Sequence, residues 1–310
     1  MIELAVASKR PSCAYILFKS RQWTAIGNTG SRVLQSLVCV PPVVSTYTVD
    51  GDVMFVQCGS CSPADPDAEH ETPPKVAVRW FVHGKDGVES TAAALDVLNS
   101  RSSLTILFSH GNAIDLGGCD AYCRWVAQAW GCNIVTYDFF NYGLSDKRKF
   151  SEHALHRAAH GVLKHALQMC PGHTLFLLGK SLGSVPSVWI AAHDELKKHI
   201  AGVMLVSPLA SGARTMCDLN TFPSFIRTWA DAVFGDSIER MPHIECPILI
   251  IHGTEDTIVP VQNARDLFCA ISSRSPPPIL LEAGHNDIET RHGRVFLMCV
   301  QEFMAAISMH

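Results

Sequence analysis

The sequence predicts an α/β fold: a doubly wound, mostly parallel sheet with helices on both faces. Two observations predict it. From residue 104 onward, apolar runs of strand length alternate with longer segments in which apolar residues recur at helical spacing. One run ends in Gly179-Lys180-Ser181-Leu182-Gly183 and a helical segment follows at once, so that a strand turns sharply into a helix. With 310 residues, 47% of them hydrophobic and 17% charged, the chain is long enough for one large domain of this kind.

The expected elements follow one another in a regular order. Segments 76–83 and 91–98 are typical of an antiparallel hairpin leading into the sheet, because a glycine-containing turn joins them. Strands and helices then alternate, and each helix is long enough to cross from one parallel strand to the next. The strands are expected at 104–109, 133–138, 174–179, 201–206, 247–252 and 279–282. The helices are expected at 119–130, 151–169, 184–193, 261–272 and 291–307.

The chain is expected to divide near residue 75. Residues 1–74 are expected to form an N-terminal extension and linker, partly disordered, since 65–74 is rich in proline and acidic residues. The first 49 residues carry five basic side chains and one acidic one beside aromatic residues, which favours weak contact with a membrane surface. A transit peptide and a ragged extension are the alternatives. Residues 75–310 are expected to form the folded domain, with a lid insertion at about 207–243.

The lid segment interrupts the alternation of strands and helices. It contains large apolar side chains, among them Phe222, Phe225 and Trp229, which are expected to hold an acyl chain near the end of the sheet. Ordinary packing of a small cap on the sheet explains the same composition equally well.

Ser181 is the expected nucleophile. A serine on a tight turn between strand and helix projects its hydroxyl clear of the backbone, and Gly179 and Gly183 let the two elements approach closely. Because an alcohol is a weak nucleophile near neutral pH, Ser181 needs a base, and the base needs an orienting carboxylate.

Two later strands each lead into a candidate partner for Ser181. The run 247–252 leads into a polar turn that contains Asp256, and 279–282 leads into a loop that contains His285. The carboxyl ends of parallel strands form one edge of the sheet, where α/β proteins place their sites. We therefore expect His285 to act as the base and Asp256 to orient it. The rival acids are Glu255, Glu282 and Asp287.

An oxyanion hole is expected beside Ser181, because acyl transfer places negative charge on the carbonyl oxygen. One donor is the backbone N–H of Leu182, the residue after the nucleophile. The second is the backbone N–H of Asn112, in the loop after strand 104–109, with Ala113 as the near alternative. His110 is expected to brace this loop.

Composition argues against several other classes of protein. The formal net charge of −4 gives no sign of nucleic-acid binding. The 12 cysteines are expected to be reduced thiols, because no secretory signal is evident. Cys58 and Cys61 form a single pair without a second pair at zinc spacing, so neither a metal nor another cofactor is expected. No apolar run approaches the roughly 20 residues that span a bilayer. The expected location is the cytoplasm, with peripheral membrane contact through the basic N-terminus.

The chain resembles the α/β-hydrolase-domain 17 group of protein depalmitoylases over about residues 75–307. The matching motifs are 107–117, 137–138, 142–145, 183–186, 207–212, 250–256 and 284–289. The resemblance implies an α/β-hydrolase fold and a serine hydrolase that cleaves thioesters of S-palmitoylated protein cysteines. It also implies that Ser181, Asp256 and His285 form the triad.

The chain departs from that group in three ways. Lys180 stands where the group usually has glutamine, and Asn141 stands where it has glycine. The N-terminal cysteine cluster of the animal proteins is missing, since only Cys13 and Cys39 lie in the first 50 residues.

Three functions are compatible with these residues. The leading one is a thioesterase or esterase that acts on an acylated protein or a small acyl ester. A serine peptidase of the prolyl-oligopeptidase or aminopeptidase type shares this catalytic domain. A non-catalytic α/β-hydrolase that binds a ligand is the least expected, because the serine, acid and histidine are all present.

Overall fold

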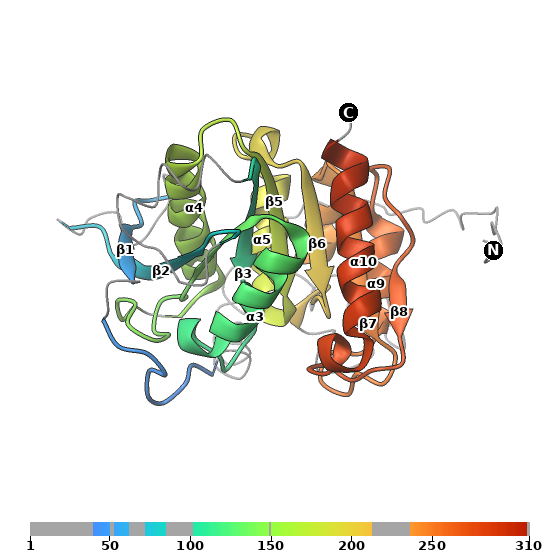
Figure 1. The fold of residues 1–310 in the computed structure, drawn as a ribbon, viewed down its shortest axis with the longest axis horizontal. Helices are drawn as coiled ribbons and strands as arrows, with labels where there is room; N and C mark the ends of the chain where they lie inside the picture. Colours follow the sequence, from blue (N-terminus) through green and yellow to red (C-terminus); the bar gives the residue numbers. More distant parts are fainter. Residues whose placement is uncertain are drawn as a thin grey trace, which may run out of the picture.

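The computed structural model describes residues 40–49, 53–61, 72–84, 102–148, 150–212 and 236–308. Within them lies one sheet with the strand order β1-β2-β4-β3-β5-β6-β7-β8 (Figure 1). Strands β3 to β8 pair in parallel, whereas β2 runs antiparallel to both β1 and β4. The predicted α/β fold with a mostly parallel sheet is therefore confirmed. The strands are β1 (Met54–Gln57), β2 (Lys75–Phe81), β3 (Leu104–Ser109), β4 (Asn133–Tyr137), β5 (Thr174–Lys180), β6 (Gly202–Val206), β7 (Ile248–Gly253) and β8 (Ile279–Leu281).

The main helices lie where apolar residues recur at helical spacing, and local residues determine where they begin and end. For example, the side chain of Ser151 accepts a hydrogen bond from the N–H of Ala154 at the start of one helix, and Gly131 ends another in the left-handed region. The helices are α3 (Leu116–Trp130), α4 (Glu152–Met169), α5 (Ser184–Ala192), α8 (Ser237–Arg240), α9 (Gln262–Ala270) and α10 (Ile288–Ser308). Single turns of 3-10 helix are η1 (Ser181–Gly183), η2 (Lys197–His199) and η4 (Met241–His243).

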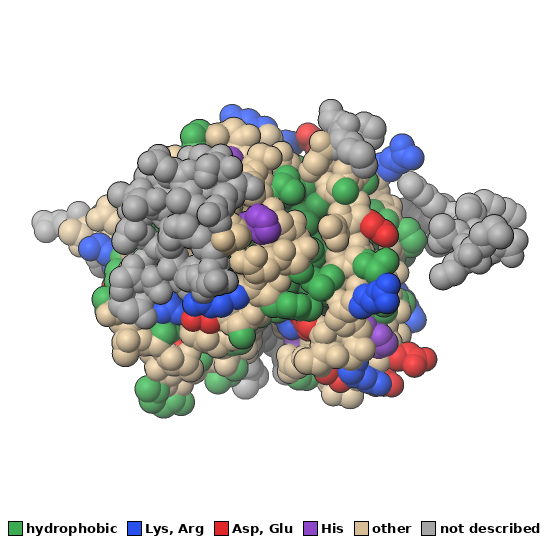
Figure 2. All heavy atoms as spheres, in the orientation of Figure 1, with side chains coloured by type: hydrophobic (Ala, Val, Ile, Leu, Met, Phe, Trp, Pro, Cys, Tyr) green, Lys and Arg blue, Asp and Glu red, His purple; other side chains and the backbone are tan. Residues whose placement is uncertain are grey.

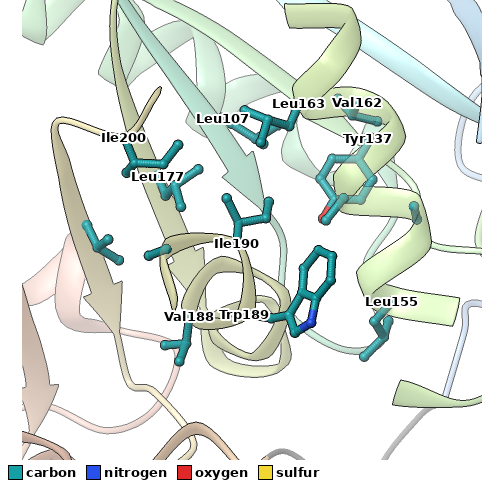
Figure 3. Packing of buried hydrophobic residues seen from close by; sticks show 14 of the residues in the cluster. Leu107, Tyr137, Leu155, Val162, Leu163, Leu177, Val188, Trp189, Ile190 and Ile200 are labelled. Carbon is teal, nitrogen blue, oxygen red and sulfur yellow. The ribbon is translucent and has the colours of Figure 1, made fainter. Parts of the chain in front are cut away.

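The helices cover both faces of the sheet and create two apolar layers. Alternate side chains of β3 show the division: Leu107 packs in the layer under α4, α5 and α9, while Ile106 and Phe108 pack in the layer under α3 and α10. Figure 3 shows the first layer, where Ile190 of α5 lies among side chains of the strands and of α4. This packing anchors α5, whose first residue follows directly on η1.

The sheet begins earlier in the sequence than expected. Strand β1 lies within the segment expected to be extension and linker, and it pairs with β2 in the register Met54 to Val78. The stretch before it also contacts the domain: Thr46 donates its N–H to Asp115 at 2.7 Å, and the Tyr47 hydroxyl donates to Asp138. The hairpin partner expected at 91–98 lies outside the described residues.

Hydrophobic side chains gather on the surface between α3 and α10 (Figure 2). Trp125 of α3 stacks on Phe296 of α10 with ring centroids 6.2 Å apart, while Val295 and Met298 are exposed nearby on α10. In the part of the chain that the structure describes, no helix has the length and apolar character needed to cross a membrane.

Candidate active site

Three parallel strands place the expected catalytic residues at one edge of the sheet. Ser181 follows β5 directly, Asp256 lies in the turn after β7, and His285 lies in the loop after β8. Because these strands run in the same direction, their carboxyl ends meet at one edge, as the sequence pattern predicts.

Ser181 has a backbone conformation that few residues other than glycine adopt. Its φ angle is 51°, in the left-handed region, and the chain passes at once from β5 into η1 and α5. Such a conformation costs about 1–3 kcal/mol and persists only where the surrounding structure enforces it. The turn therefore has the strained geometry of a nucleophile elbow.

The two glycines beside Ser181 are required by close backbone contacts. A Cβ atom at Gly179 would lie 2.7 Å from the carbonyl oxygen of Gly183. A Cβ atom at Gly183 would overlap the carbonyl oxygen of Ser109, at the end of β3. The elbow can thus form only where neither position carries a side chain.

Gly183→Ala is expected to destabilise the protein by about 3 kcal/mol, the upper range for overpacking a buried position. The reason is that the obstructing atom is backbone, which cannot rotate away. Gly59→Ala is the matched control, since a Cβ atom there meets nothing within 4 Å. Urea unfolding of both variants measures the difference. Equal stability of the two would show that the elbow tolerates a side chain at 183.

A continuous chain of hydrogen bonds joins the three residues. His285 Nε2 lies 2.9 Å from Ser181 Oγ, and His285 Nδ1 lies 2.7 Å from Asp256 Oδ2. A carboxylate only accepts hydrogen bonds, so Nδ1 carries the proton and Nε2 is left to accept the proton of the serine hydroxyl. The imidazole is therefore oriented as a base toward Ser181.

The carboxylate of Asp256 is held on both oxygens. Its Oδ1 accepts the backbone N–H groups of Ile258 at 2.9 Å and Val259 at 2.8 Å. Burial disfavours ionisation, but hydrogen bonds from His252, His285 and Val259 outweigh it and hold the pKa of Asp256 well below its usual range. The ionised group therefore stabilises the fold at neutral pH, and this contribution is lost as the pH falls below the ordinary carboxyl pKa of about 4.

The rival acids have other partners. Glu255 pairs with Arg291 at 2.6 Å on an exposed part of the surface. Asp287 accepts the backbone N–H of Gly284 at 2.6 Å, which shapes the loop that carries His285. Of these carboxylates, Asp256 is the one that the structure brings to His285.

The loop expected to supply an oxyanion donor lies against the elbow. A Cβ atom at Gly111 would be 3.8 Å from Ser181 Cβ. The side-chain oxygen of Asn112 accepts hydrogen bonds from the Tyr142 hydroxyl at 2.6 Å and from the N–H of Val40 at 2.8 Å, which hold the loop in place. Leu182 directly follows Ser181 in η1. The roles of the Asn112 and Leu182 N–H groups stay predictions.

His110 is buried in the same loop. Its Nδ1 lies 2.7 Å from the carbonyl oxygen of Gly111, and its Nε2 lies 3.4 Å from Asp138. The first contact lies within the loop, and the second connects the loop to the residue that follows β4, in keeping with a bracing role.

Sequence reasoning missed two contacts around this site. Lys180, directly before the nucleophile, pairs with Glu289 at 2.6 Å, and both side chains are largely buried. Glu289 lies in the first turn of α10, so the ion pair joins the elbow to the segment that follows the His285 loop. The second is His252 of β7, whose Nε2 lies 3.2 Å from Asp256 Oδ2. A histidine at the end of a strand gives no specific signal in the sequence for this contact.

The expected acyl-chain residues Phe222, Phe225 and Trp229 lie outside the described residues, as does most of the lid segment. A cavity of about 510 Å³ is present elsewhere, between β1 and α4, and its lining includes Lys75, His160 and Lys164. Since β1 is four strands away from β5 in the sheet, this cavity is separate from Ser181. Among the described side chains, no group of three or more His, Cys, Asp or Glu is arranged to hold a metal ion.

Comparison with known proteins identifies clear relatives. The chain is 34% identical over 262 residues to α/β-hydrolase domain-containing protein 17B of Xenopus tropicalis, which covers 83% of this chain and 86% of that protein. It is 33% identical to the human protein 17B, with the same coverage. It is also 36% identical over 191 residues to α/β-hydrolase domain-containing protein aho-3 of Caenorhabditis elegans, where it spans only 54% of that protein's length. No family model matches the chain.

Solved structures show the same fold at low sequence identity. The esterase Pf2001 of Pyrococcus furiosus superposes with a TM-score of 0.59 at 16% identity, over 87% of this chain and 99% of the esterase. The monoacylglycerol lipase of Paleococcus ferrophilus superposes with a TM-score of 0.52 at 17% identity, over 74% of this chain and 98% of the lipase. At this identity the likeness concerns the fold alone.

Proposed function

Because this chain belongs to the family of the α/β-hydrolase domain-containing 17 proteins, we propose that it is a serine hydrolase that cleaves acyl thioesters or esters. The observation that carries the proposal is the hydrogen-bonded series from Ser181 through His285 to Asp256, built on a strained elbow. An oriented base within 2.9 Å of a serine hydroxyl is the arrangement that activates this nucleophile.

Acylation follows from this geometry. Ser181 Oγ attacks the acyl carbon as its proton passes to His285 Nε2. The resulting imidazolium faces the carboxylate of Asp256, which stabilises its charge. The N–H groups of Leu182 and Asn112 donate hydrogen bonds to the carbonyl oxygen and stabilise the negative charge that develops on it. The tetrahedral intermediate then releases a thiol or an alcohol, which takes the proton from His285, and the acyl group stays on Ser181.

Deacylation repeats these steps with water. His285 accepts a proton from a water molecule, whose oxygen attacks the acyl carbon of the acyl-enzyme. Collapse of the second tetrahedral intermediate breaks the bond to Ser181 Oγ, which recovers its proton from His285. The products are a carboxylic acid and the regenerated enzyme.

The substrate proposed within this class is a palmitoylated protein cysteine. The support is the similarity to the 17B proteins together with the motifs shared with the depalmitoylase group. A thiolate is a good leaving group, so a thioesterase needs little beyond the triad, the two N–H donors and an apolar slot. The basic N-terminal segment is proposed to bring the enzyme to membrane surfaces, where such substrates lie.

A comparison of substrates tests this proposal. The values of kcat/KM are measured for palmitoyl, butyryl and acetyl thioesters, for the matching oxygen esters and for aminoacyl amides, with the Ser181→Ala protein as the background. We expect hydrolysis of thioesters and esters to exceed that of amides, with the palmitoyl thioester preferred. Faster cleavage of aminoacyl amides would indicate a peptidase, and no turnover of any substrate would indicate a binding protein.

A further inference from the structure

Two histidines contact the same oxygen of Asp256. His285 Nδ1 lies 2.7 Å from Oδ2, and His252 Nε2 lies 3.2 Å from it. His252 comes from the end of β7 and is completely buried, whereas His285 comes from the loop after β8. The reaction described above uses only His285.

The surroundings of His252 determine its protonation. Its Nε2 lies 2.9 Å from the backbone carbonyl oxygen of Val259, which can only accept a hydrogen bond, so Nε2 carries a proton. Its Nδ1 is buried without a hydrogen-bond partner in the structure. A second proton on Nδ1 would be a buried donor without an acceptor, which is costly. The Nε2–H of His252 therefore faces the carbonyl oxygen of Val259 at 2.9 Å and Oδ2 of Asp256 at 3.2 Å.

We propose that His252 is a positioning residue that holds Oδ2 of Asp256 toward His285 and tunes the strength of His285 as a base. This inference rests on the proposed function, in which His285 is that base. The backbone N–H groups of Ile258 and Val259 occupy Oδ1, so His252 completes a set of donors around the carboxylate. With donors on both oxygens, the carboxylate cannot rotate away from the imidazole.

His252 tunes the base strength of His285 because both imidazoles donate to the same oxygen, Oδ2 of Asp256. The ionisable groups that the structure records against this carboxylate are His252 and His285. A second hydrogen-bond donor to Oδ2 stabilises the negative charge on this oxygen, so the oxygen interacts less strongly with His285. The imidazolium form of His285 then gains less from Asp256, and a larger fraction of the enzyme holds the unprotonated base near neutral pH.

Removing the donor tests the inference. In His252→Leu, we expect the titration midpoint of the His285 imidazole to rise by roughly 0.5 to 1 pH unit. Long-range ¹⁵N NMR measures this midpoint directly. The acidic limb of the pH profile of kcat/KM for an activated acyl ester should move in the same direction, and kcat should fall by about 10- to 100-fold as Asp256 loses its position.

Two further variants separate positioning from packing. His252→Gln keeps a side-chain N–H donor and should lie between wild type and His252→Leu in both readouts. His156→Leu is the control, because His156 is also buried but stacks on Trp189 with ring centroids 4.6 Å apart. It should leave the titration midpoint of His285 unchanged.

The inference would be overturned if His252→Leu folds and the titration midpoint of His285 is unchanged or lower. His252 would then be a packing residue. If His252→Leu does not fold, His252→Phe takes its place, because phenylalanine keeps a ring but has no N–H donor. An unchanged or lower midpoint in that variant overturns the inference as well. Labelling of wild type by a fluorophosphonate is measured in parallel. Its absence would contradict the proposed function, while the NMR midpoints still report the coupling of His252 to His285.

Discussion

Ser181→Ala is expected to abolish covalent labelling by fluorophosphonates and to lower kcat by a factor on the order of 10⁶, the loss seen when a serine hydrolase loses its nucleophile. The variant removes the hydroxyl oxygen that lies 2.9 Å from His285 Nε2 and would form the acyl-enzyme. Labelling and single-turnover hydrolysis of an activated ester measure the two losses.

The control for this variant is Ser187→Ala. Ser187 lies one turn into α5, and its hydroxyl donates to the backbone carbonyl oxygen of Gly183 at 3.0 Å. It should keep its label. A Ser181→Ala protein that labels as strongly as wild type would show that another residue is the nucleophile.

Asp256→Asn is expected to lower kcat by about 10⁴ while the protein stays folded. The N–H groups of Ile258 and Val259 require an acceptor, so the amide oxygen of the asparagine takes the place of Oδ1. Its NH₂ group then faces His285 and His252, which both donate toward this position in wild type. The His285 imidazole is forced into the opposite tautomer, with its proton on the nitrogen that faces Ser181.

Two neighbouring carboxylates serve as controls for Asp256→Asn. Glu255→Gln should change kcat little, because the Glu255 side chain is exposed and pairs with Arg291. Asp287→Asn should have a larger effect than Glu255→Gln, since Asp287 shapes the loop that carries His285, but a far smaller one than Asp256→Asn. Steady-state kinetics with an activated ester decide the ranking. Equal losses at Asp256 and Asp287 would contradict the choice of Asp256 as the orienting acid.

Much of the fold follows from local features of the sequence. The apolar runs are long enough for strands and the periodic segments are long enough for crossover helices. Strands β3 to β8 and helices α3, α4, α5, α9 and α10 therefore lie within a few residues of the predicted ranges. Parallel connection then determines that the carboxyl ends of β5, β7 and β8 share an edge. For that reason, the sequence predicts that Ser181, Asp256 and His285 lie at the same edge of the sheet.

The elbow is also encoded locally. Gly179 and Gly183 mark the close approach of strand and helix, and a serine between them at the end of an apolar run indicates the turn. Lys180 and His252 carry no comparable signal. A lysine before the serine and a histidine at a strand end are compatible with exposed or structural roles as well as with contacts to the site.

By itself, the sequence determined the order of the elements, the sharp turn at Ser181 and the edge of the sheet at which the site lies, because each depends on spacing along the chain. The tertiary structure alone decided that β1 joins the sheet, that Lys180 pairs with Glu289, and that His252 contacts the carboxylate of Asp256. These outcomes depend on the directions of side chains and on pairing between segments distant in sequence. From the sequence alone, each of these residues could contact several partners. In the folded protein, packing and burial select the arrangement in which the buried polar groups are hydrogen-bonded.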